Sequence, residues 1–232
     1  MHVIVTDLTC FQAGTDTVCL GGVDERGEVY RPQPYVKIGD CDRWKLRPGS
    51  IVELEFPRRR GSAPHVEDTK VSRVIPRGIG TQARFRRALE QTLRGSLSDG
   101  FGVDVEDGEK CVPLAVKPIR SLITIVPKNF YLLTDYMREG KLRADFADAT
   151  GCRWRQVSVT DRCLLMYLED SGWTERAVVQ AARFLRQQEV LFLRVGLSRE
   201  YKSTDGRRGY WIQINGIYTF PQQLNYLAWP NG

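Results

Sequence analysis

The sequence has few of the residues from which enzymes build nucleophilic and metal-binding sites. Only two of its 232 residues are histidine, His2 and His65, and its six cysteines form no CxxC pair. A structural zinc site needs four clustered ligands, and a serine or cysteine nucleophile needs a base beside it. The sequence therefore disfavours zinc binding and nucleophilic hydrolysis. We expect free, mostly buried thiols and no metal or other cofactor.

Long hydrophobic runs and glycine-rich nucleotide motifs are also missing. No apolar run approaches the roughly 20 residues that span a bilayer. The opening MHVIVTDLTC lacks the basic and apolar pattern of a secretory signal. Neither GxGxxG after a strand nor GxxxxGK followed by Ser or Thr occurs. We therefore expect a cytoplasmic protein with no membrane partner, and we disfavour the α/β nucleotide-binding folds.

The chain is instead rich in short runs of β-branched and aromatic residues, bounded by turn residues. Such runs predict strands. The predicted strands are HVIV, TVCLGGVD, VYRPQPY, IVELEF, TKVSRVI, SLITIVP, FYLLTDY, CRWRQVSVTD, RCLLMYLED, EVLFLRVGL and GYWIQINGIYTF. Two stretches have helical spacing instead: residues 81–94, with Thr81 as N-cap, and the stretch that follows Thr174 as N-cap.

This layout of strands, helix and strands occurs twice. It predicts a mainly β protein with a few helices, built as two OB-like small β-barrel lobes. We place the N-terminal lobe at residues 1–117 and the C-terminal, more basic lobe at residues 118–232. Each lobe has the size of an OB-type barrel with one inserted helix.

Several segments resemble a known family. VYRPQPY, PGSIVELEFP and PHVED in the first half, and LRVGLSREY and GYWIQINGIYTFP in the second, are similar to a poorly characterised prokaryotic family described as containing a dual OB-like domain. The resemblance implies a pair of OB-like barrels and, by analogy, oligonucleotide or nucleic-acid binding. It implies no catalytic residues.

Positive charge is unevenly distributed along the chain. Residues 1–118 hold 18 Lys and Arg against 17 Asp and Glu, a net charge of +1, whereas residues 119–232 hold 16 against 11, a net charge of +5. An excess of this kind favours an anionic partner. We therefore look for a binding site in the second half.

The densest cluster of basic and aromatic residues surrounds one predicted hairpin. Cations that follow a phosphate backbone beside flat stacking surfaces are typical of single-strand nucleic-acid binding. Gln213 shares a strand face with Trp211 and suits hydrogen bonding to base edges. The alternative is that the aromatics are core and the hairpin tip is solvated. The candidate residues are Arg194, Arg199, Tyr201, Lys202, Arg207, Arg208, Trp211 and Gln213.

Two further basic clusters form a secondary candidate patch. Arg58, Arg59 and Arg60, with His65 nearby, fall in a predicted loop, where a solvated turn is the simpler interpretation. Arg153 and Arg155 flank Trp154 on a predicted strand. Strand alternation places both arginines on the face opposite the indole, which predicts a buried Trp154 and an exposed basic stripe.

These observations leave three hypotheses. The first is a non-enzymatic module that binds single-stranded DNA or RNA, or a nucleotide-like anion, through the C-terminal basic and aromatic surface. The second is a protein-interaction adaptor whose C-terminal Tyr226 and Trp229 anchor a protein partner. The third is an enzyme acting on nucleic acid or nucleotides. Its candidate carboxylate pairs, such as Glu53 and Glu55, lack the lysine of a nuclease-like metal site.

Overall fold

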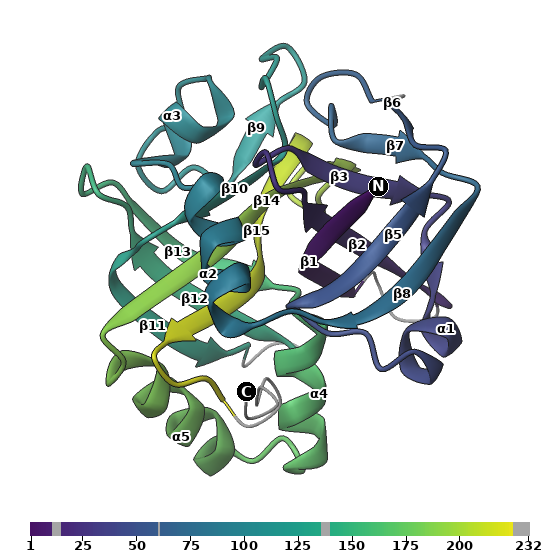
Figure 1. Ribbon diagram of the computed structural model, residues 1–232. Coiled ribbons are helices and arrows are strands. Elements are labelled where there is room, and N and C mark those ends of the chain that lie inside the picture. Colours follow the sequence, from purple (N-terminus) through teal and green to yellow (C-terminus); the bar gives the residue numbers. More distant parts are fainter. Residues whose placement is uncertain (11–14, 60, 136–139, 225–232) are drawn as a thin grey trace.

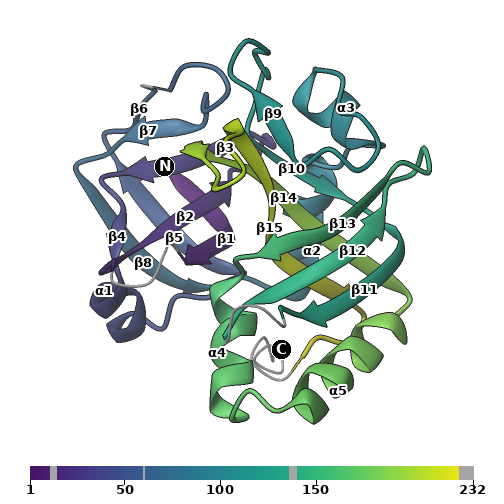
Figure 2. The same ribbon diagram turned by 180° about the vertical axis from the view of Figure 1, so that it is seen from behind.

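The computed structural model describes residues 1–10, 15–59, 61–135 and 140–224. The chain is mainly β, as predicted, and its strands form two sheets that meet along one side of each (Figures 1 and 2). The strands of the first sheet are β1 (His2–Cys10), β2 (Thr17–Val23), β3 (Val29–Gln33), β4 (Val36–Lys37), β5 (Ser50–Glu55), β6 (Arg58–Arg59), β7 (Asp68–Lys70) and β8 (Arg73–Ile79).

The second sheet contains the remaining strands. They are β9 (Cys111–Pro113), β10 (Leu122–Ile125), β11 (Lys128–Thr134), β12 (Leu142–Ala147), β13 (Arg153–Val159), β14 (Val190–Lys202) and β15 (Arg208–Phe220). The helices are α1 (Ile38–Arg43), α2 (Gln82–Gln91), α3 (Leu97–Phe101), α4 (Arg162–Asp170) and α5 (Glu175–Arg186).

The first sheet, which we call the first lobe, has the strand order of an OB barrel. β1, β2 and β3 form an antiparallel meander, β7 lies parallel to β3, and β6 lies antiparallel to β7. β5, which pairs with β1, is separated from β6 only by Phe56 and Pro57. Because β5 and β6 act as one bent strand, the pairing returns to β1 and the predicted OB-like topology is confirmed.

The second lobe, formed by the second sheet with α3, α4 and α5, repeats this order. β11, β12 and β13 form the meander, β15 is parallel to β13, and β14 is antiparallel to β15. β10 pairs with β14 and is separated from β11 only by Val126 and Pro127. Proline cannot donate a ladder hydrogen bond, so a proline marks the bend of the long strand in both lobes.

Both predicted helices are confirmed, together with their caps. The Thr81 hydroxyl accepts a hydrogen bond from the Arg84 amide ahead of α2, and Thr174 does the same for Ala177 ahead of α5. The prediction of a strand at RCLLMYLED is wrong, because this segment is α4. Asp161 caps its first turn by accepting from the amides of Cys163 and Leu164, and Leu164 and Leu168 fall on one buried face.

The second lobe begins earlier in the chain than the expected boundary at residue 117. β9 pairs with β15, and Leu97, Phe101 and Val112 belong to the core of the second lobe. Between the lobes, α2 packs Phe85 and Leu89 against Phe192, Tyr218 and Phe220. The link between the lobes is therefore a packed helix and not a free linker.

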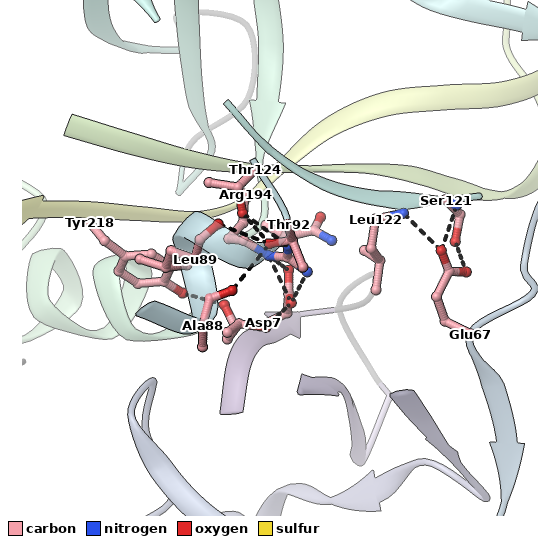
Figure 3. A network of polar contacts seen from close by, with 12 residues as sticks. Asp7, Glu67, Ala88, Leu89, Thr92, Ser121, Leu122, Thr124, Arg194 and Tyr218 are labelled. Carbon is pink, nitrogen blue, oxygen red and sulfur yellow. Dashed lines mark hydrogen bonds and ion pairs between the residues drawn. The ribbon is translucent and has the colours of Figure 1, made fainter. Parts of the chain in front are cut away.

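Buried polar contacts also join the two lobes, and we call this contact region the seam. Arg194 of β14 forms an ion pair of 2.8 Å with Asp7 of β1, and the two side chains are 0% and 1% exposed. The same guanidinium donates to the hydroxyls of Thr92 and Thr124 (Figure 3). Glu67 accepts from the backbone amides of Ser121 and Leu122. The charges of Arg194, Asp7 and Glu67 are therefore buried and hydrogen-bonded, an arrangement of the kind that fixes one relative arrangement of packed elements.

Within the described residues, no helix is both long enough and apolar enough to cross a membrane. All six cysteines are free, as expected.

Candidate nucleic-acid interface

The hairpin of β14 and β15 is confirmed, and its tip lies beside β9 and near β7 in both views of the ribbon (Figures 1 and 2). Gly206, with φ of 90°, lies in the turn between residues 203 and 207. In OB folds the loop between strands four and five and the face of strands two and three bind oligonucleotides. In the second lobe these features are this hairpin turn and the face of β12 and β13.

Arg194, a predicted binding residue, lies in the interior of the molecule. Its side chain has no exposed surface and is held by Asp7, Thr92 and Thr124. The middle of β14 is buried and its last four residues are exposed, and Arg194 lies in the buried part, where Asp7 neutralises its charge. It belongs to the seam, and the prediction that it contacts a ligand is wrong.

Arg199 lies at the edge of the seam. Its Nη1 and Nη2 donate to the two carboxylate oxygens of Asp68 at 2.7 and 2.9 Å, and its Nε donates to the Tyr35 hydroxyl at 2.9 Å. Partial burial alone would lower the pKa of Arg199, but the hydrogen bonds that it donates to Asp68 and Tyr35 raise it above its ordinary value. This guanidinium therefore has all three nitrogens occupied by the first lobe.

The arginines at the hairpin tip are exposed, yet each faces a carboxylate. Arg207 bonds Asp205 at 2.7 Å and Glu109 at 3.0 Å, and Arg208 pairs with Glu200. The Arg207 guanidinium also lies 4.9 Å from the centre of the Trp211 ring. The tip is basic in composition, but these acids neutralise much of its charge.

The other predicted residues of the hairpin keep a more open surface. Tyr201 is 46% exposed, and Lys202 is exposed without an ion pair among the described residues. Trp211 is half-buried, and its Nε1 donates to the carbonyl of Tyr201 at 3.2 Å. Gln213 is half-buried beside Ser158 of β13, so the face it shares with Trp211 is partly open.

Arg153 and Arg155 are both exposed and Trp154 is buried, as predicted. The two arginines line a groove of about 360 Å³ together with Asp107, Gly108, Lys110 and Gln156. In the described part of the chain, neither guanidinium has a carboxylate within ion-pair distance. The Asp107 carboxylate accepts a hydrogen bond from the Arg153 backbone amide. This groove therefore keeps a surplus of positive charge, and we call it the β13 groove.

Lys110 connects the β13 groove to the hairpin. Its carbonyl accepts from the amide of Ile212, and Trp211 pairs with the neighbouring Cys111. Partial burial, followed by the positive charges of Arg143 and Arg207, lowers the pKa of Lys110. Cations from three separate segments therefore act on one another at this face.

The secondary patch in the first lobe is divided by the structure. Arg58 is exposed on β6, whereas Arg59 lies 4.3 Å from the centre of the Tyr30 ring and bonds Glu28. Arg60 lies outside the described residues. His65 is 8% exposed, so it is not part of a surface basic patch. Burial, and then the nearby charges of Arg31 and Arg199, lower its pKa to about 3.

Lys110 is the residue of this interface that sequence reasoning missed. It lies in the glycine-rich, acidic stretch DGFGVDVEDGEK, where the sequence predicts neither a strand nor a helix. It joins the site only because β9 pairs with β15 from the far end of the chain. The only local signal was the apolar run CVPLAV that follows it, which could have been read as a strand.

Comparisons with known proteins add little. No family model matches the chain, and no curated protein matches it. Among the solved structures that are similar to this chain is one described as p202 HIN1 in complex with 12-mer dsDNA; the likeness covers 92% of this chain and 91% of that chain, at 10% identity and a TM-score of 0.35.

Proposed function

We propose that this protein is a non-enzymatic module that binds single-stranded nucleic acid across the outer face of its second lobe. The observation that carries the proposal is the β13 groove, where Arg153, Arg155 and Lys110 converge and neither arginine has a carboxylate partner among the described residues. When cations without a carboxylate partner contact phosphates, the contacts and the release of counterions make the free energy of binding more favourable.

The neighbouring hairpin supports the same function. Tyr201 and Trp211 offer aromatic surfaces on which bases can stack, and each stacked base contributes about 1–3 kcal/mol. Gln213 adds an amide beside them. The groove and the hairpin also occupy the two places where an OB barrel presents its oligonucleotide-binding surface.

The test compares two double variants that each remove two positive charges. Arg153→Ala with Arg155→Ala should weaken binding of labelled oligothymidylate and oligouridylate by about 10–100-fold. It should also lower the slope of log affinity against log salt by about 1.4 for a single strand. Arg207→Ala with Arg208→Ala is the matched control and should cost only a few-fold, because both arginines already face carboxylates.

Equal losses in the two double variants would place the site elsewhere. If the parent protein binds neither oligonucleotide at low salt, the proposed class of function is wrong. The adaptor alternative rests on Tyr226 and Trp229, which lie outside the described residues, so that prediction stays untested.

A further inference from the structure

A second candidate site lies where the two lobes meet. This inter-lobe cleft has a volume of about 410 Å³. One wall is formed by residues 61–65, which connect β6 to β7, and the other by Arg199, Glu200 and Tyr210 of the hairpin strands. The cleft shares no lining residue with the β13 groove. Junctions between packed units are a common place for ligand sites.

The cleft lining holds Arg199 against Asp68 and Glu200, and the two arginines paired with these carboxylates, Arg31 and Arg208, bring the net charge of the whole group to +1. Asp68 accepts from Arg31 Nε at 2.6 Å and from both terminal nitrogens of Arg199, so one carboxylate serves two guanidiniums. The other carboxylate that lines the cleft, Glu200, is paired with Arg208. The cluster of Arg31, Asp68 and Arg199 therefore has a net charge of +1.

Two buried side chains, His65 in the cleft lining and Arg31 paired with the lining residue Asp68, have nitrogens without a hydrogen-bond partner in the described residues. Arg31 is 4% exposed, and its Nη2 has no hydrogen-bond partner within the described residues. Neither imidazole nitrogen of His65 makes a hydrogen bond there either, although the Ser198 backbone lies close enough to favour the protonated ring. Buried polar groups are nearly always satisfied, so unmet donors beside a cleft point to a missing acceptor.

The His65 imidazole is buried, and its surroundings are positively charged. Its ring packs edge-on against Tyr210, with the ring centres 5.6 Å apart. Burial, and then the charges of Arg31 and Arg199, lower the pKa of His65 to about 3. Near neutral pH the ring is thus uncharged, with one N–H donor, in a positive environment.

We infer that the inter-lobe cleft binds a phosphate-type oxyanion, supplied either by a free nucleotide or by one phosphate of a nucleic-acid backbone. Oxyanion oxygens would accept from Arg31 Nη2 and from the His65 N–H, and the negative charge would offset the second guanidinium. Both nitrogens lie beneath the surface, so binding would require the two side chains to turn toward the anion. This inference does not rest on the proposed function of the β13 groove.

The chain itself provides the probe, because His2 and His65 are its only histidines. Imidazole resonances of the full chain are followed by NMR during titration with inorganic phosphate. The His65 signals should move and saturate, and the pKa of His65 should rise by at least about one unit, a tenfold change in proton affinity. His2, which is 60% exposed, is the internal control.

Two variants change the charge balance in opposite directions. Arg199→Gln removes the excess cation and should weaken phosphate binding by at least about tenfold, whereas Asp68→Asn increases the excess and should strengthen it. If Arg199→Gln fails to fold, the parent titration and Asp68→Asn still decide the question. Equal phosphate affinity in Asp68→Asn and the parent would overturn the charge argument.

The source of the phosphate is separated by two further titrations. A response to thymidine monophosphate identifies a free nucleotide site, and a response only to an oligonucleotide without terminal phosphates identifies the backbone. The variant with Arg153→Ala and Arg155→Ala should keep the His65 response to inorganic phosphate. If phosphate, nucleotide and oligonucleotide all leave the His65 signals and pKa unchanged, the inference is wrong, whatever the β13 groove binds.

Discussion

The seam between the lobes and the β13 groove both contain arginines, but their surroundings differ: those of the seam are paired with carboxylates, whereas those of the groove are not, within the described residues. In the seam, Arg194 is fully buried against Asp7, and Arg199 has all three nitrogens occupied. In the groove, Arg153 and Arg155 are exposed and have no carboxylate partner in the described residues. The positive excess of the second half therefore does not mark one surface. An arginine that is buried and paired with a carboxylate stabilises the fold, whereas an arginine without such a partner is available to bind a ligand.

The largest expected effect comes from breaking the seam. Arg194→Met leaves the Asp7 carboxylate buried without its cation, and this should reduce the free energy of unfolding by about 3–5 kcal/mol. Urea denaturation measures the loss. Adding Asp7→Asn to Arg194→Met should recover part of it, because the unpaired charge is then gone. Arg208→Met, at an exposed position, should leave the urea midpoint unchanged; an equally unchanged midpoint in Arg194→Met would contradict the role of the seam.

A second prediction concerns pH and Asp161, which bridges to Thr9 across the seam. Burial raises the pKa of Asp161 to about 7, against the opposing hydrogen bonds from backbone amides. The folded state then keeps a proton that the unfolded state releases near pH 4. The resulting stabilisation is present below about pH 4 and lost as pH rises through about 7, and it amounts to at most about 4 kcal/mol.

Asp161→Asn removes this titration and keeps an oxygen that can cap α4. The difference in stability between the parent and the variant should shift in favour of the variant between pH 5 and 7.5. The two proteins must be compared at each pH, because the lowered pKa of His65 makes the free energy of unfolding of both increase with pH up to about pH 6.5. Subtracting one free energy from the other removes this shared dependence. A difference that stays constant with pH would show that Asp161 is ionised throughout.

The smallest expected effect concerns Arg207 of the hairpin, which is exposed but paired with carboxylates. Glu109→Gln frees Arg207 from one of its carboxylates and should tighten oligonucleotide binding by about threefold. Glu106→Gln removes an equal charge from the same loop, but Glu106 has no ion pair among the described residues. If both variants bind equally well, the gain reflects net charge alone and not the release of Arg207.

Much of this fold could be predicted from the sequence, because local signals dominate it. Thr81 and Thr174 predicted the starts of α2 and α5 as N-caps. The alternation around Trp154 correctly predicted that Arg153 and Arg155 are exposed. The helix α4 was missed because RCLLMYLED is apolar enough to resemble a strand, and its cap, Asp161, precedes the run. Short apolar runs do not separate the two structures by composition.

The candidate site was harder to predict, for a different reason. Whether an arginine is neutralised depends on carboxylates that are remote in sequence, such as Asp7 for Arg194 and Glu109 for Arg207. Lys110 belongs to the site because β9 pairs with β15, and no local sequence pattern predicts that pairing. Composition therefore located a charged region, and only the tertiary contacts separated its structural charges from its open ones.

The packing of α2 has a consequence for how the molecule behaves as a whole. Phe85 on this helix meets Tyr218 near the end of the chain, and the Tyr218 hydroxyl donates to the carbonyl of Thr6 near its start. Removing either end therefore opens the same small core. The two barrels, although each has a complete topology, should melt together in one cooperative transition, and neither is expected to persist as an independent fragment.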